Sequence, residues 1–159
     1  MKLSVQIDEE FRDMLSEEWL SRVVEETLSD QKVGPQAELS VSITGDETMR
    51  SLNLEYRGLD ETTDVLSFAL TEEHVAEGIP AFVTPPDDLL HLGEVIISYP
   101  QARRQAGEGP VMLEKELALL TVHGILHLLG HDHDEPDRER EMKAVEERVL
   151  SSLKISEVR

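Results

Sequence analysis

Residues 113–133 read LEKELALLTVHGILHLLGHDH and contain the most apolar stretch of the chain. From Leu113 to Leu129 the apolar side chains are too numerous for a single face, which is typical of a helix buried on most sides. Gly130 has no Cβ and can adopt a left-handed conformation, so it ends this helix and turns the chain back. The stretch therefore predicts a long buried helix followed by a tight turn.

The rest of the chain alternates between strand-like and helix-like patterns. Strands are expected at 2–7, 38–44, 64–70 and 91–98, and helices at 16–28, 46–53, 100–106, 113–129 and 136–153, with Asp46 as the N-cap of the second helix. This order predicts one α+β domain over residues 1–159, with a small mixed four-stranded sheet covered by about five helices. Residues 71–90 are acidic and contain several prolines, which predicts a long surface loop or flap.

The bulk composition excludes several classes of protein. The chain has 159 residues, no cysteine and a formal net charge of −19 at pH 7. Lack of cysteine excludes disulfides and thiolate ligands, and it suits a reducing compartment. No secretory signal pattern and no apolar run of roughly 18 residues is present, so we expect a cytoplasmic protein with no membrane partner. The acidic charge argues against non-specific nucleic-acid binding and favours a protein as the recruiting contact.

Three histidines in and after the long helix have the arrangement of a metal site. His123 and His127 are four residues apart, so both rings project from one helix face. The turn at Gly130 then brings His133 round as a third ligand. Three imidazoles suit zinc and leave a fourth position open for water, whose pKa zinc lowers towards about 7. We therefore predict one Zn²⁺ per chain and a metal-dependent hydrolase.

Other interpretations of these histidines stay open. They could be unrelated, although burying two imidazoles on an apolar helix without a partner costs several kcal/mol. The metal could be structural, although only His131 or Asp132 is at hand as a fourth ligand. The same two residues are the candidates for a general base. Nickel and cobalt also suit a nitrogen-rich site.

The spacing H-x-x-x-H-x-x-G-x-x-H is shared with the metzincin proteases. Those enzymes carry a glutamate directly after the first histidine as the general base, whereas this chain has Gly124. A metalloprotease or amidase is therefore the second hypothesis. A third is a non-enzymatic assembly factor that the metal merely stabilises.

Three segments resemble one known family, the YbeY endoribonucleases. They are HGILHLLGHDH (123–133), NLEYRGLDETTDVLSFAL (53–70) and LGEVIIS (92–98), and they follow the family's order along most of the chain. Two positions depart from the family pattern: His131 stands before the final Asp-His pair, and Glu146 stands where the family has glutamine in the last helix.

The resemblance implies a zinc-dependent endoribonuclease specific for single strands. It further implies maturation of the 3′ end of small-subunit ribosomal RNA, a role in ribosome quality control, and contacts with ribosomal proteins or the small subunit. It places zinc on His123, His127 and His133, and it makes Arg57 functional. We expect Arg57 and His127 to be the catalytic residues, because a guanidinium can hold two phosphate oxygens where negative charge develops. Aromatic residues are few, so sequence-specific readout by stacked bases is not expected.

Overall fold

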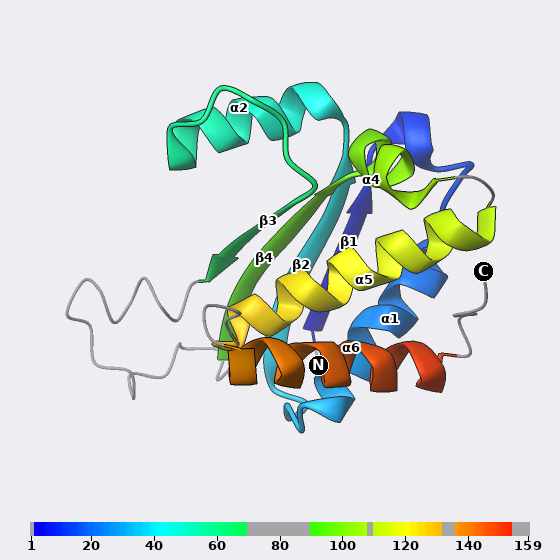
Figure 1. Ribbon diagram of the computed structural model, residues 1–159, viewed down its shortest axis with the longest axis vertical. Helices are drawn as coiled ribbons and strands as arrows, with labels where there is room; N and C mark the ends of the chain where they lie inside the picture. The colour runs from blue at the N-terminus through cyan, green and yellow to red at the C-terminus, as the bar shows by residue number, and fades with distance from the viewer. Residues whose placement is uncertain (1, 70–89, 108–109, 132–135, 154–159) are drawn as a thin grey trace.

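The chain folds into a four-stranded sheet and a layer of helices, and this confirms the predicted α+β class. A computed structural model describes residues 2–69, 90–107, 110–131 and 136–153 (Figure 1). In chain order the elements are β1 (Lys2–Ile7), η1 (Glu9–Phe11), α1 (Glu17–Asp30), β2 (Ala37–Thr44), α2 (Asp46–Arg57), β3 (Val65–Ala69), β4 (Leu90–Ser98), α4 (Tyr99–Ala106), α5 (Pro110–Leu128) and α6 (Pro136–Ser152).

Every predicted strand and helix is present, and the 3-10 turn η1 is the one described helix that was not predicted. Leu90, the last residue of the predicted loop at 71–90, already belongs to β4. The rest of that loop lies outside the described residues. Within the described part of the chain, no helix combines the length and the apolar content that crossing a membrane requires.

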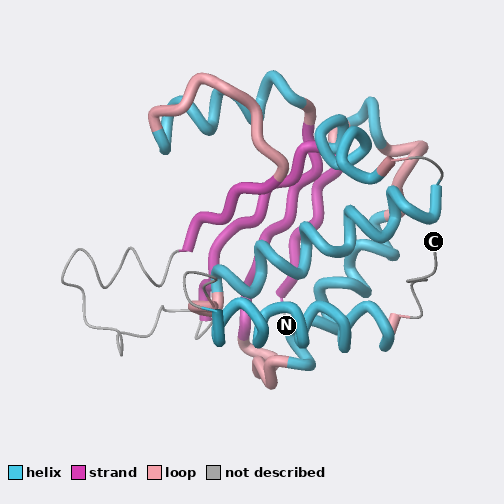
Figure 2. Tube along the Cα trace, viewed as in Figure 1, coloured by secondary structure: helices cyan, strands magenta, loops and turns pink. Residues whose placement is uncertain are grey.

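The sheet is mixed and has the strand order β1-β2-β4-β3 (Figure 2). β1 and β2 are parallel, β2 and β4 are parallel, and β3 runs antiparallel to β4 at one edge. Successive side chains of a strand point to opposite faces, and in β2 the buried residues Leu39, Val41 and Ile43 alternate with partly exposed serines. One face of the sheet therefore carries the main core, beneath α1, α5 and α6 (Figure 1).

Helix α5 occupies the centre of this layer and contacts β3, β4, α1, α4 and α6. It lies close against the sheet at Gly124, where an added Cβ would lie 2.6 Å from Cγ1 of Val95. Ser67 of β3 strengthens the contact, because its hydroxyl donates a hydrogen bond to the Gly124 carbonyl at 3.1 Å. This packing fixes the depth of α5 on the sheet and, with it, the positions of His123 and His127.

Helix α2 covers part of the opposite face through Met49, which packs with Leu66 of β3 and Ile96 of β4. It is longer than predicted and ends at Arg57, because Gly58 supplies the left-handed C-cap with φ 73°. Asp46 is the first helical residue rather than the N-cap, which is Gly45. Tyr56 and Arg57 are therefore held on a helix and not on a loop.

Candidate active site

A cleft of about 660 Å³ lies between α2 and α5. Its walls are the last residues of α2, Tyr56 and Arg57, the segment 63–69 that includes all of β3, and the last turns of α5 with His123 and His127. Residues that are far apart in the sequence thus share one cavity. Two of the three predicted metal ligands and both predicted catalytic residues belong to it.

The two helical histidines converge, as their spacing predicts. Nε2 of His127 lies 3.0 Å from Nε2 of His123, and the ring centroids are 4.5 Å apart at an interplanar angle of 74°. Two ligand nitrogens about 2.05 Å from a tetrahedral zinc would be roughly 3.3 Å apart. The observed pair therefore has nearly the separation that one shared cation requires.

Glu146 of α6 lies behind His123. Its Oε2 is 3.5 Å from Nδ1 of His123, the ring nitrogen that does not face His127. A carboxylate in this place holds a proton on Nδ1 and leaves the Nε2 lone pair available for a metal. Sequence reasoning noted Glu146 only as a departure from the family pattern. The signal was present, because Glu146 follows buried Met142 by four residues and so shares its inner helix face.

His133, the third predicted ligand, lies outside the described residues, as does Asp132. Within the ranges that are described, no group of three His, Cys, Asp or Glu side chains is assembled that could hold a metal ion. His131 is described, and its Nε2 donates a hydrogen bond to Oε1 of Gln31 at 2.8 Å. This bond directs His131 towards the end of α1, and His131 does not line the cleft.

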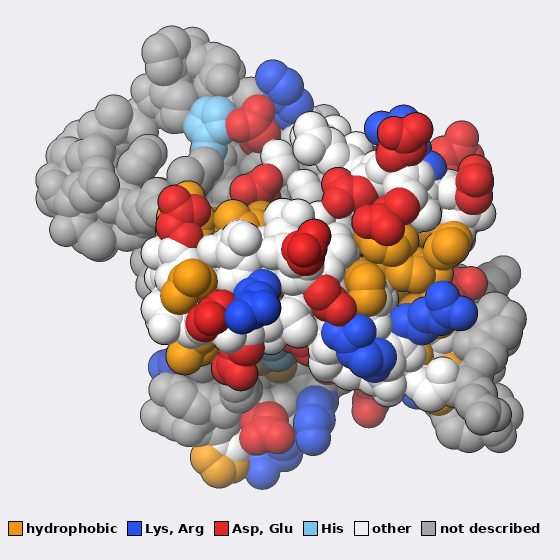
Figure 3. Space-filling view, turned by 90° about the horizontal axis from the view of Figure 1, so that it is seen from above, with side chains coloured by type: hydrophobic (Ala, Val, Ile, Leu, Met, Phe, Trp, Pro, Cys, Tyr) orange, Lys and Arg blue, Asp and Glu red, His pale blue; other side chains and the backbone are white. Residues whose placement is uncertain are grey.

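Arg57 is exposed and, within the described part of the chain, it forms no ion pair. The protein is acidic, and its surface carries carboxylates across the face shown in Figure 3. Four other arginines are paired with such carboxylates: Arg50 with Asp60, Arg104 with Asp46, Arg140 with Asp137 and Arg148 with Asp30. The guanidinium of Arg57 is therefore available to an anion in the cleft.

Asp64, a carboxylate that lines the same cleft, has a structural role. Its Oδ1 accepts a hydrogen bond from the backbone N–H of Val65 at 2.7 Å, and its Oδ2 accepts one from Gln105 at 3.2 Å. These bonds fix the start of β3.

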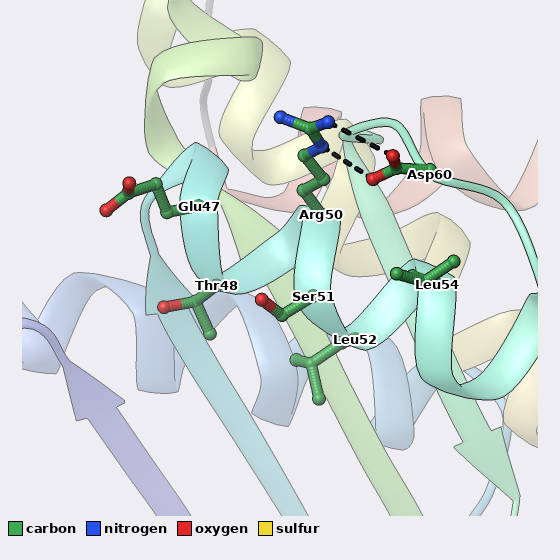
Figure 4. Close-up of a pocket in the computed structure, with 7 residues that line it drawn as sticks. All are labelled: Glu47, Thr48, Arg50, Ser51, Leu52, Leu54 and Asp60. Carbon is green, nitrogen blue, oxygen red and sulfur yellow. Dashed lines mark hydrogen bonds and ion pairs between the residues drawn. The ribbon is translucent and has the colours of Figure 1, made fainter.

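A second hollow of about 600 Å³ lies along α2 (Figure 4). Its arginine, Arg50, donates two hydrogen bonds to Asp60, at 2.7 and 3.1 Å. The guanidinium and its charge keep the pKa of Asp60 below its usual range. No histidine lines this hollow, and its one arginine is already neutralised. The histidine cleft, and not the hollow along α2, is therefore the candidate active site.

Comparison with known proteins decides the family. The sequence profile described as Endoribonuclease YbeY matches residues 4–154. The chain belongs to the YbeY family. The YbeY endoribonuclease of one Dehalococcoides mccartyi strain is 45% identical over 157 residues, covering 97% of this chain and 98% of the relative. The relative from Moorella thermoacetica, also named Endoribonuclease YbeY, is 46% identical over 134 residues, which cover 84% of each chain.

A solved structure supports the fold. The solution structure of TM1509 from Thermotoga maritima superposes with a TM-score of 0.57 and covers 96% of this chain and 91% of that one, at 23% identity. The resemblance to the YbeY family that the three sequence motifs predicted is thus confirmed. The structure adds that the motifs at 53–70 and 123–133 meet, since both line the cleft. The first contributes Tyr56, Arg57 and residues 63–69, and the second contributes His123 and His127.

Proposed function

We propose that this chain is a cytoplasmic, zinc-dependent endoribonuclease that hydrolyses single-stranded RNA. One observation carries the proposal: the Nε2 atoms of His123 and His127 meet at 3.0 Å in the same cleft that holds Arg57. Imidazole nitrogens at that distance need either a shared proton or a shared cation between them. The names of the relatives supply the substrate class, because they are endoribonucleases.

The donor set fits zinc. The two helical imidazoles are neutral nitrogen ligands with nearly tetrahedral spacing, Glu146 supports one of them, and His133 is proposed as the third ligand. Bound there, zinc would supply Lewis acidity that makes a water molecule a stronger acid near neutral pH. Arg57, from the α2 wall, is placed to hold two oxygens of a phosphodiester group and to stabilise the negative charge that develops on them.

The biological substrate that we propose is small-subunit ribosomal RNA at its 3′ end, with a role in ribosome quality control and contacts to ribosomal proteins. The support for this finer assignment is the family membership and the three shared motifs. The net charge of −19 favours recruitment through a protein rather than through naked RNA. Such recruitment would bring the RNA to Arg57 despite the acidic surface.

The experiment compares cleavage of a labelled single-stranded RNA by the untreated, chelated and zinc-restored protein. We expect chelation to abolish cleavage and zinc to restore it. His127→Ala should lose both zinc and activity. Arg57→Glu should keep zinc and lose activity, while Arg103→Glu, an exposed charge reversal on α4, should keep both. Cleavage that survives chelation at an unchanged rate would overturn the proposal and point to a contaminating nuclease.

The same samples separate the other hypotheses. A structural zinc predicts that chelation melts the fold and that a folded His133→Ala variant functions normally. A metalloprotease predicts release of peptides from casein that His127→Ala abolishes. The packing of Gly124 against Val95 weighs against the protease, because α5 has no room at that position for the glutamate that metzincins use.

A further inference from the structure

Two aromatic side chains stand in the cleft beside Arg57. Tyr56 is 61% exposed, the highest value among the exposed large hydrophobic residues that the structure describes. Its ring meets Phe68 of β3 edge to face, with centroids 5.0 Å apart and an interplanar angle of 61°. Both residues line the same cleft as His123 and His127. A large apolar ring is thus held in a fixed orientation with most of its surface open to solvent.

The other described aromatic residues are part of the core. Phe11 and Tyr99 stack on each other at 4.8 Å and are 6% and 5% exposed. Trp19 is partly buried and packs against the core, and Phe82 lies outside the described residues. The small number of aromatic residues argues against sequence-specific readout by stacked bases. Two of them are nevertheless gathered at the candidate site, where a ring can contact a base without reading its identity.

We propose that Tyr56, supported from the side by Phe68, forms a stacking site for an unpaired nucleobase next to the phosphate that Arg57 holds. This inference rests on the proposed function and explains how the site would select an unpaired RNA segment. Aromatic rings contribute to single-strand binding through the faces of the bases, whatever the base. A base inside a duplex is already stacked on both sides, so the site selects single strands without reading sequence.

The charge of the protein favours such a contact. Most nucleic-acid binding gains its affinity by replacing counterions with lysine and arginine. A chain with a net charge of −19, in which Arg50, Arg104 and Arg148 are paired with carboxylates, gains little affinity in this way. Stacking carries no net charge, so it supplies affinity without attracting polyanions in general. A phosphate contact at Arg57 combined with a neighbouring base contact at Tyr56 then suits one short unpaired segment.

The test uses the full-length zinc-loaded protein and a short unstructured RNA, either intact or with one base removed at successive positions near the cleavage site. Tyr56→Ala should raise KM by about 5-fold to 150-fold with little change in kcat. Tyr56→Phe and Tyr56→Trp should restore most of the loss, because a ring and not a hydroxyl is required. Leu54→Ala is the matched control, an exposed apolar residue of the same helix outside the cleft.

Two readouts distinguish stacking from a general loss of structure. Removing the critical base should cost the wild type as much as Tyr56→Ala does, and it should cost Tyr56→Ala nothing further. The Tyr56→Ala effect should also be the same at about 50 and 200 mM salt, whereas the effect of Arg57→Gln should shrink as salt rises. The melting temperature and zinc content of Tyr56→Ala should match those of the wild type.

An unchanged KM for Tyr56→Ala would overturn the stacking site while leaving the endoribonuclease intact. A full base-removal penalty that persists in Tyr56→Ala would overturn it as well. If the wild-type protein shows no metal-dependent cleavage of RNA, the proposed function itself fails. The two failures are therefore distinguishable within the same experiment.

Discussion

The carboxylate of Glu146 lies 3.5 Å from Nδ1 of His123, and this contact joins the last helix of the chain to a candidate metal ligand on α5. The family's glutamine at this position also offers an oxygen that can accept a hydrogen bond from Nδ1–H. The common property is thus an acceptor behind the ring. It selects the tautomer whose Nε2 lone pair is free to bind a metal.

We predict that Glu146→Ala lowers the affinity for Zn²⁺ by about 10-fold to 100-fold, the usual cost of losing such a support. Glu146→Gln should retain an affinity within a few-fold of the wild type, because the amide oxygen still accepts a hydrogen bond from Nδ1–H. Competition against a chromophoric chelator measures both. Glu147→Ala is the control, since Glu147 is the adjacent glutamate of α6 and is exposed. Equal affinities for Glu146→Ala and Glu147→Ala would remove Glu146 from the site.

Gly124 permits α5 to approach the sheet, and its replacement should weaken the fold. A Cβ at this position would lie 2.6 Å from Cγ1 and 3.2 Å from Cγ2 of fully buried Val95. Overpacking of this kind costs about 1–3 kcal/mol, and alanine recovers about 1 kcal/mol through its better helix propensity. We predict that Gly124→Ala lowers the free energy of unfolding by up to about 2 kcal/mol, measured by urea denaturation.

A double-mutant cycle with Val95→Ala identifies the cause. Val95→Ala alone creates a cavity and should be destabilising. In the double variant, the methyl group that Gly124→Ala introduces occupies that cavity. The double variant should therefore lose less stability than the sum of the losses in the two single variants. Strictly additive effects would show that the two side chains do not compete for the same space.

Asn53 positions the end of α2 from inside the protein. It is 1% exposed, and its Nδ2 donates a hydrogen bond to the carbonyl of Glu61 at 2.9 Å. This bond spans the turn that follows Arg57 and connects α2 to the segment that leads into β3. Asn53→Ala should cost about 0.5–1.5 kcal/mol of stability, because it removes this hydrogen bond. It should also lower kcat/KM on RNA while zinc binding stays unchanged.

Leu54→Ala is the control for this prediction, since Leu54 is the next residue and is exposed. Zinc titration and RNA cleavage of both variants are compared at a temperature where each remains folded. Loss of zinc affinity in Asn53→Ala would mean that the substitution disturbs α5 as well, contrary to the local role proposed for Asn53.

The parts of this site that local sequence patterns can predict are those that depend on one element. His123 and His127 share a helix, so their spacing alone brings the two rings together. Arg57 belongs to a different helix on the other wall of the cleft, and no periodicity reports that proximity; only the family resemblance suggested it. The proposed stacking site could not be predicted for a related reason: composition counts the aromatic residues, whereas the pairing of Tyr56 with Phe68 depends on how α2 docks on β3.

Helix boundaries show the same limit. The pattern of apolar residues ended the second helix near Asn53, but the structure continues it to Arg57, because Gly58 supplies the cap. Asp46 was expected to cap that helix with its own side chain. It is instead the first helical residue, and its carboxylate is occupied by groups from elsewhere in the chain. The hydroxyls of Ser98 and Thr62 donate to it at 2.9 and 3.1 Å, and Arg104 donates at 3.0 Å.

These contacts make stability depend on pH. Burial raises the pKa of Asp46, but the hydrogen bonds from Ser98, Arg104 and Thr62 outweigh it and leave the pKa below its usual value of 3.8. A carboxyl whose pKa is depressed by folding stabilises the fold above its unfolded pKa, and this stability is lost as pH falls through the folded pKa. We predict that Asp46→Asn costs roughly 1 kcal/mol at neutral pH, a modest amount because the side chain is 34% exposed.

The difference in free energy of unfolding between Asp46→Asn and the wild type should be constant from neutral pH down to about pH 4. Below that pH the difference should disappear, as the wild-type carboxyl takes up its proton. Urea denaturation at several pH values measures it. Glu47→Gln is the control, because Glu47 shares the first turn of α2 and its interaction with the helix dipole, but it is exposed and receives none of these hydrogen bonds. A similar pH profile for both variants would assign the effect to the helix dipole. A loss confined to Asp46→Asn would assign it to the contacts with Ser98, Thr62 and Arg104.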